Sequence, residues 1–334
     1  MPNRRSEDAQ GRGKGNPPPE ATYSPETTPS AETIPSPARS GDFPWELPHT
    51  FLGLDEAASD PSRSRAFVLP VPYEATTSWG GGTRLGPRGI LEASRYVELW
   101  DQEMERDHSL AGVHTLPALE LTREGPGPAM TELEAAYGGL LDRLKDRFPI
   151  MLGGEHSISA PAIRAVAARQ SSRLNVLQMD AHADLRPSYE GTLFSHASAM
   201  YRVLDVADVV GVGIRGISQE EVGVAREHAG VTLIYADEMW EEDHWMDRAL
   251  DALGDPVYLT FDVDYFDPSL VPSTGTPEPG GGDWYRTLKF LRRVFQEREV
   301  VAMDVVELAP IPGLSAPDFL VAKLVYKLLG YRFG

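Results

Sequence analysis

The chain has 334 residues, 41% of them hydrophobic, so it can bury the sizeable core of a globular protein. It contains no cysteine, which excludes a disulfide framework, a cysteine nucleophile, an iron–sulfur cluster and a cysteine-ligated zinc site. With 31 basic and 50 acidic residues its formal charge is −19, a field that repels nucleic acids and anionic membranes and attracts cations. No apolar run reaches the roughly 20 residues of a membrane helix, and no signal-peptide core follows the first Met. We therefore expect a soluble, cytoplasmic protein.

Residues 1–45 are rich in Pro, Ser, Thr and Gly and poor in large apolar side chains. Such a segment cannot bury enough apolar surface to offset the entropy cost of ordering it. We therefore predict a disordered N-terminal tail over residues 1–45 and one folded domain over residues 46–334.

Short β-rich runs alternate with helical patterns in the remainder of the chain. Most of the runs are apolar on both faces, as expected of strands in a sheet that helices cover on both sides. The predicted strands are Ala66–Val71, Ile150–Leu152, Asn175–Met179, Val209–Val212, Thr232–Tyr235, Val257–Phe261 and Val300–Met303.

Three helical patterns lie between or after these strands. One opens at Pro87 and carries Ile90, Ala93 and Val97 on one face. The second repeats apolar residues at helical spacing over residues 133–148, and the last spans about residues 318–329. The alternation predicts a three-layer α/β domain with a mainly parallel sheet.

Potential metal ligands follow one predicted strand directly. In such sheets, sites gather where strands end. Asn175–Met179 runs into Asp180, His182 and Asp184, and this spacing places all three side chains on one face of an extended backbone. A polar turn is the alternative, but an exposed turn rarely needs a histidine flanked by two carboxylates.

Two further strand ends carry similar residues. Asp262 and Asp264 follow one strand, and His156 follows another within Gly-Gly-Glu-His-Ser, residues 153–157. A phosphate-binding loop is the alternative interpretation of the two glycines, but it is disfavoured because no lysine follows them. Taken alone, His156 is also compatible with a helix cap or a core position. Together the two His and four Asp suit divalent ions such as Mn²⁺, and six ligands fit a bridged pair of ions better than one ion.

Three more features belong to this edge of the sheet. Glu307 lies past the end of the last strand, where it can pair with a cationic substrate. His196 lies on a loop that can return over the metals. The irregular loop Pro268–Gly282 is either a plain connection or, as with many long loops in compact domains, part of the site.

In register, these segments resemble the motifs of the ureohydrolase family, which contains arginase, agmatinase and related guanidino-acid hydrolases. The resemblance runs in order from about Ala66 to the C-terminus, and six motifs in register, with a further N-terminal segment at residues 81–87, are far more specific than any one of them. The matching segments are Gly-Gly-Thr-Arg-Leu-Gly-Pro (81–87), Gly-Gly-Glu-His-Ser (153–157), Asp-Ala-His-Ala-Asp (180–184), Ser-His-Ala-Ser (195–198), Phe-Asp-Val-Asp (261–264), Gly-Thr-Pro-Glu-Pro-Gly-Gly (275–281) and Met-Asp-Val-Val-Glu (303–307).

The resemblance implies an arginase-like α/β/α fold and a catalytic domain that holds two Mn²⁺ ions. Motif position assigns the first ion to His156, Asp180, Asp184 and Asp262. It assigns the second ion to Asp180, His182, Asp262 and Asp264, so that Asp180 and Asp262 bridge. By the same analogy we expect a homo-oligomer, a trimer or a hexamer.

The resemblance also implies that hydroxide attacks a guanidinium carbon and that urea and an amine are the products. Glu307 would orient the guanidinium, Asp184 would carry a proton to the leaving amine, and His196 would be the outer proton shuttle.

The substrate-discriminating positions depart from the arginase pattern. Arg186 stands where arginase carries Asn, and Ser218 stands where it carries a carboxylate. Both departures favour agmatine, cleaved to putrescine and urea, over arginine; aminopropylagmatine ranks second and guanidino acids such as guanidinobutyrate and guanidinopropionate third. Arg186 either receives a substrate carboxylate or pairs with a neighbouring acid.

Two other function classes are weighed against this one. Deacetylases of the same fold use a single zinc with a similar Asp-x-His run, but His156 and the complete second-ion set argue against them. A non-catalytic binding or regulatory role is the other alternative, and the intact ligands and Glu307 argue against it.

Overall fold

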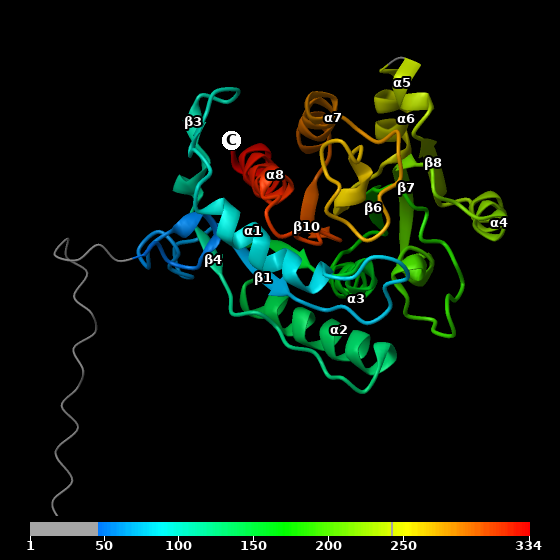
Figure 1. The fold of residues 1–334 in the computed structure, drawn as a ribbon, viewed down its shortest axis with the longest axis horizontal. Helices are drawn as coiled ribbons and strands as arrows, with labels where there is room; N and C mark the ends of the chain where they lie inside the picture. The colour runs from blue at the N-terminus through cyan, green and yellow to red at the C-terminus, as the bar shows by residue number, and fades with distance from the viewer. Residues whose placement is uncertain (1–45, 242) are drawn as a thin grey trace, which may run out of the picture. The chain divides into compact units, whose positions relative to one another are not determined.

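A computed structural model describes residues 46–241 and 243–334; the tail predicted over residues 1–45 lies outside the described residues. The main sheet of the described part has the strand order β4-β1-β5-β10-β9-β6-β7-β8, and all its neighbouring pairs are parallel (Figure 1). Its strands are β1 (Ala66–Val71), β4 (Val113–Thr115), β5 (Phe148–Gly153), β6 (Leu174–Met179), β7 (Ala207–Ile214), β8 (Val231–Tyr235), β9 (Val257–Asp262) and β10 (Val300–Val306).

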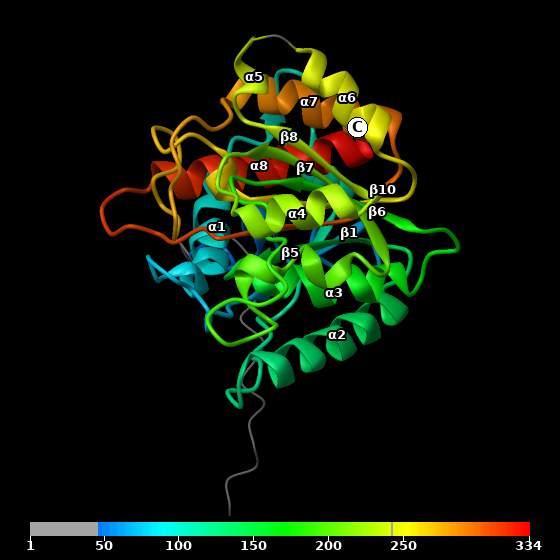
Figure 2. The ribbon, with the colours of Figure 1, turned by 90° about the vertical axis from the view of Figure 1, so that its right-hand side faces the viewer.

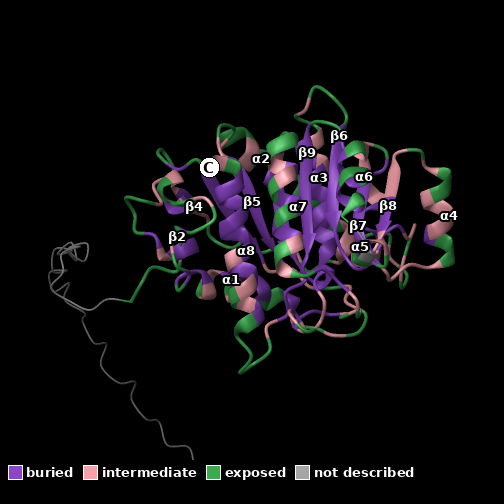
Figure 3. Ribbon diagram, turned by 90° about the horizontal axis from the view of Figure 1, so that it is seen from above, coloured by how far each residue is buried: buried purple, intermediate pink, exposed green. Residues whose placement is uncertain are grey.

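Helices cover both faces of this sheet, as Figure 2 shows. One buried apolar cluster joins α1, α6, α7 and α8 to one face, and a second joins α2 and α3 to the other. The central strands β5, β6 and β9 are buried along their whole length, which explains why their sequences are mostly apolar (Figure 3). The helices are α1 (Gly86–Ser94), α2 (Pro126–Arg143), α3 (Ser159–Ala167), α4 (Gln219–Glu227), α5 (Glu238–Glu241), α6 (His244–Ala252), α7 (Trp284–Glu297) and α8 (Ala316–Phe333).

The structure confirms the seven predicted strands and the three-layer α/β class. It corrects the second helical pattern: α2 ends at Arg143, and Phe148 is the first residue of β5. Phe148 precedes Pro149, and the residue before a proline is pushed out of the helical region into extended backbone. The first pattern was also too long, because α1 ends at Ser94, before Val97.

The elements not predicted from the sequence are the helices α3 to α7, the strand β4 at one edge of the sheet, and the separate antiparallel pair β2 (Trp100–Asp101) and β3 (Arg106–Asp107). The strands were missed because of their length. Two or three residues are too few to show a period of two. Within the described residues, no helix is long and apolar enough to cross a membrane.

The strand order determines where the site can form. β5, β10, β9 and β6 are consecutive neighbours and run parallel, so their carboxyl ends meet at one edge of the sheet. These four strands precede the predicted ligands and Glu307.

Candidate metal centre

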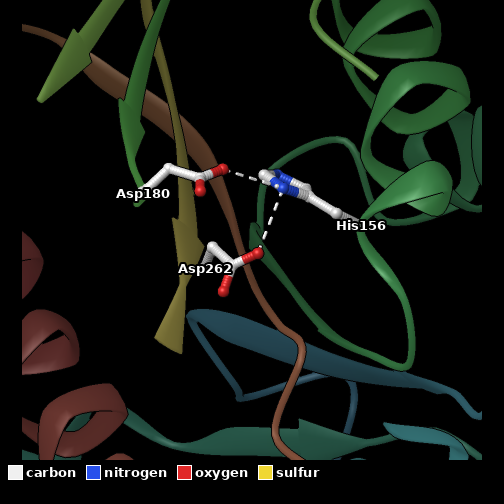
Figure 4. A group of neighbouring side chains, drawn as sticks. All are labelled: His156, Asp180 and Asp262. Atoms are coloured by element: carbon white, nitrogen blue, oxygen red, sulfur yellow. Dashed lines mark ion pairs between the residues drawn. The ribbon is translucent and has the colours of Figure 1, made fainter. Parts of the chain in front are cut away.

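The first group of predicted ligands converges on His156, which follows β5. Its Nδ1 lies 3.1 Å from Asp180 Oδ2, 3.0 Å from Asp184 Oδ2 and 3.3 Å from Asp262 Oδ2. Figure 4 shows the ring directed at Asp180 and Asp262, which come from the ends of β6 and β9. All four residues are buried. The structure therefore brings together, around one nitrogen atom, the residues predicted to hold the first ion.

A second group lies directly beside the first. His182 Nδ1 is 2.9 Å from Asp264 Oδ2 and 3.8 Å from Asp180 Oδ1. Asp180 belongs to both groups: the candidate ligand atoms of His156, Asp180 and Asp262 lie within 4.8 Å of one another, and so do those of Asp180, His182 and Asp264. This arrangement supports a bridging role for Asp180; the bridging role of Asp262 stays a prediction.

The hydrogen bonds behind His156 show which of its nitrogens is available to an ion. Thr260 Oγ1 lies 2.9 Å from His156 Nε2 and 2.6 Å from Asp304 Oδ1. The hydroxyl proton of Thr260 goes to the carboxylate, so Nε2 must donate to Thr260 and the neutral ring keeps its lone pair on Nδ1. The Tyr258 hydroxyl donates a hydrogen bond of 2.7 Å to the other oxygen of Asp304, Oδ2.

The environment of Nδ1 fits a cation. This atom is fully enclosed and has no hydrogen-bond partner within the described residues, yet three carboxylates face it. Burial lowers the pKa of His156, but Asp180, Asp184 and Asp262 outweigh burial and raise that pKa well above its usual range. A positive charge is thus favoured between the ring and the carboxylates, and a divalent ion bound by oxygen and imidazole ligands would supply it.

The carboxylates point to the same requirement. Burial and the charges of Asp264 and Asp184 raise the pKa of Asp180 to about 7. Burial and Asp264 also raise the pKa of Asp262 well above its usual range. Such closely packed, buried carboxylates cannot all ionise at neutral pH without cations, and bound divalent ions would lower both pKa values.

Glu307 lies in the same narrow cavity as the two groups. Its Oε1 accepts a hydrogen bond of 2.6 Å from the backbone N–H of His156, which leaves Oε2 for a substrate. Burial, together with the charge of Glu155, raises the pKa of Glu307 well above its usual range, so a cation beside it would be strongly favoured. Glu307 and Asp184 both have positive φ, at 66° and 51°, a strained conformation that the surrounding structure imposes at functional sites.

His196 also lines this cavity, as do Gly275 and Thr276 from the long loop that follows β9. The loop Pro268–Gly282 is therefore part of the site and more than a connection. The segment Thr77–Gly80 also lines the cavity and was not among the site residues predicted from the sequence. A signal was present: Trp79 is followed by three glycines, and a Cβ at Gly80 would lie only 2.9 Å from the backbone oxygen of Gly275.

Arg186 and Ser218, the two departures from the arginase pattern, contact the same buried acid, Glu221. Arg186 Nε lies 3.7 Å from Glu221 Oε2, and the guanidinium lies over the ring of Tyr189 at 4.9 Å. The Ser218 hydroxyl donates to Glu221 Oε2 at 2.7 Å and caps α4. Of the two roles considered for Arg186, the structure supports pairing with a neighbouring acid.

Residues 64–330 match the family model described as the arginase family. The chain belongs to the arginase family. An N(1)-aminopropylagmatine ureohydrolase of Synechocystis sp. is 38% identical over 292 residues, which cover 85% of this chain and 94% of that protein. An agmatinase of Pyrococcus horikoshii is 29% identical over 271 residues, 79% of this chain and 90% of that protein.

Solved structures agree with this membership of the arginase family. The agmatine ureohydrolase of Thermoplasma volcanium has a TM-score of 0.72 at 27% identity and covers 83% of this chain and 93% of its own. The proclavaminate amidino hydrolase of Streptomyces clavuligerus has a TM-score of 0.77 at 30% identity and covers 86% and 97%. The chain is thus a hydrolase with the arginase-like α/β fold, a ureohydrolase of the agmatinase and aminopropylagmatine type.

Proposed function

We propose that this protein holds two Mn²⁺ ions and hydrolyses the guanidino group of N1-aminopropylagmatine to urea and the corresponding polyamine, with agmatine as the second candidate. On the sequence alone, agmatine ranked first and aminopropylagmatine second. Their order is changed because three relatives at 38% identity carry the aminopropylagmatine name, while a fourth relative of that name is 32% identical and the agmatinases compared are 29–34% identical.

The observation that carries the proposal is the position of Glu307 in the cavity that both ligand groups line. Its Oε2 is available to accept hydrogen bonds from a guanidinium, and the buried carboxylate matches the positive charge of that group. Two bound divalent ions would supply a hydroxide nucleophile from water near neutral pH. Glu307 would hold the guanidinium carbon in place for attack.

Asp184 and His196 are proposed to move protons. Asp184 is buried against His156 Nδ1, next to the place where the nucleophile must form, and can pass a proton to the leaving amine. His196 lines the same cavity and is intermediate in exposure, so its ring can exchange protons between the site and solvent.

The surroundings of the cavity favour an amine tail over an amino acid or a guanidino acid. Arginine and guanidino acids carry a carboxylate, and Arg186, the cation considered for receiving it, is already paired with Glu221. At the cavity wall Trp79 is 85% exposed, and an indole face attracts the ammonium groups of a polyamine.

A urea-release panel tests the proposal. The chelated protein is reloaded with Mn²⁺, Mg²⁺, Co²⁺ or Zn²⁺ and assayed with aminopropylagmatine, agmatine, arginine, guanidinobutyrate and guanidine, while bound metal is counted. We expect two Mn²⁺ per chain and the highest kcat/KM with aminopropylagmatine. One equivalent of zinc would favour the deacetylase alternative, and no urea from any compound would contradict the proposal.

A further inference from the structure

His196 is held from one side by a residue that no motif indicated, Thr76. The Thr76 hydroxyl oxygen lies 3.3 Å from His196 Nδ1 and accepts the backbone N–H of His196 at 3.1 Å. From another direction, the ring of Tyr189 packs edge-on against the imidazole, with ring centroids 5.9 Å apart. The imidazole is thus held on two sides.

Thr76 is itself anchored by Glu155, a fully buried acid beside the metal ligand His156. Glu155 Oε1 accepts the hydroxyl of Thr76 at 2.8 Å and that of Ser157 at 2.6 Å. Its Oε2 accepts two backbone N–H groups, those of Ala75 at 2.7 Å and Thr76 at 2.6 Å. Four donors therefore hold this carboxylate in one orientation.

Counting protons along this chain of contacts assigns the tautomer of His196. Thr76 has one hydroxyl proton, and two acceptors lie in reach: a carboxylate oxygen at 2.8 Å and an imidazole nitrogen at 3.3 Å. The contact with Glu155 is the shorter of the two and lies within the usual range of an O–H···O hydrogen bond, so the proton goes to Glu155. The Thr76 oxygen then presents only lone pairs to His196, and Nδ1 must carry the hydrogen.

We propose that Thr76 and Glu155 are positioning residues that hold His196 in its Nδ1–H tautomer, so that Nε2 is the nitrogen that exchanges protons in the cavity. The inference rests on the proposed function for the role of His196, but the tautomer itself does not. The support behind His156 has the same construction, carboxylate to threonine to imidazole, through Asp304 and Thr260. At His156, Thr260 contacts Nε2, and Nδ1 is left for the metal. At His196, Thr76 contacts Nδ1, and Nε2 is left to exchange protons.

One contact opposes this assignment and makes it testable. The Ser195 hydroxyl lies 3.4 Å from His196 Nδ1 and could donate to it. If Ser195 dominated, the neutral ring would carry its hydrogen on Nε2. We expect Nδ1–H because the Thr76 oxygen, which also accepts the backbone N–H of His196, is held beside this ring by Glu155.

Nitrogen NMR of the metal-loaded protein measures the tautomer without any turnover. The protein is labelled with ¹⁵N-histidine and loaded with Zn²⁺, which is diamagnetic, and the signals of His196 are assigned by subtracting the spectrum of His196→Asn. We expect Nδ1–H in the parent and in Thr76→Ser, and a shift toward Nε2–H in Thr76→Val. Thr77→Val, the same substitution one residue further along the loop, should keep Nδ1–H. An Nε2–H ring in the parent, or a Thr76→Val protein with an unchanged ring, would overturn the inference.

Kinetics with Mn²⁺ provide the second readout. Loss of outer hydrogen-bond partners commonly costs about 10- to 100-fold in activity, and we expect such a fall in kcat for Thr76→Val with little change in KM. Thr76→Ser should restore kcat, which a defect of packing alone would not predict. If the parent cleaves no guanidino compound, the proposed function fails while the tautomer can still be measured. If the parent is active and its His196 carries Nε2–H, the inference alone fails.

Discussion

Replacing Thr260 by valine removes one hydroxyl from the support of the candidate metal centre and keeps the size of the side chain. The hydroxyl accepts from His156 Nε2 and donates to Asp304 Oδ1, and all three residues are buried. In the variant both groups lose a partner, and a buried polar group without a partner costs about 1–3 kcal/mol. Because Tyr258 still donates to the other oxygen of Asp304, we expect the free energy of unfolding of the metal-free protein to fall by about 2–4 kcal/mol.

The same substitution should weaken metal binding, since nothing then fixes which nitrogen of His156 faces the carboxylates. Outer partners of a metal-binding histidine are worth about 10- to 100-fold in affinity, or about 1.4–2.8 kcal/mol. Competition with a chelator measures the affinity, and urea unfolding measures the stability.

Thr287→Val is the matched control. Thr287 is equally buried and donates its hydroxyl to the backbone oxygen of Asp283, in α7 and outside the ligand groups. It should lose stability and keep its metal affinity. Equal metal affinities of Thr260→Val and the parent would refute the tautomer argument for His156.

Three further predictions concern the substrate and the ions. Glu307→Gln should keep its metals and lose about ten- to a hundredfold in kcat/KM, because a charge-assisted hydrogen bond to the guanidinium is removed; unchanged kinetics would remove Glu307 from the mechanism. Trp79→Ala should lower kcat/KM for aminopropylagmatine about two- to fivefold more than for agmatine, as expected of an exposed cation–π contact; equal effects on both substrates would show that the indole does not sense the longer amine. Since the pKa of Asp180 in the metal-free site is raised to about 7, protons should compete with the ions below that pH, and affinity should fall by about tenfold per pH unit for each proton displaced. Calorimetry at several pH values checks this slope, and a flat profile from pH 8 to pH 5 would contradict it.

The ligands were predictable from the sequence because their signals are local. In an extended backbone, residues two apart point to the same face, so the spacing of Asp180, His182 and Asp184 places their side chains together. The mostly apolar strand before them shows that they lie at the end of a buried strand. Parallel strands place such ends together, so the cluster follows once the fold class is known. Both ligand groups confirm that convergence.

The support behind the ligands could not be predicted in this way. Thr260 meets His156 across 104 residues, and Thr76 meets His196 across 120. No sequence pattern distinguishes a threonine that links a carboxylate to a histidine from an ordinary threonine in a strand or loop. Which side chains its hydroxyl contacts depends on how the strands and loops pack.

The sequence by itself thus determined the layered α/β class, the strand ends and the residue types that suit divalent ions, because periodicity and spacing act over a few residues. Only the tertiary structure decided which nitrogen of His156 is free, that Arg186 is paired with Glu221, and that Trp79 lies beside the cavity. Those outcomes depend on protons and charges shared between segments that lie far apart along the chain and touch only after folding.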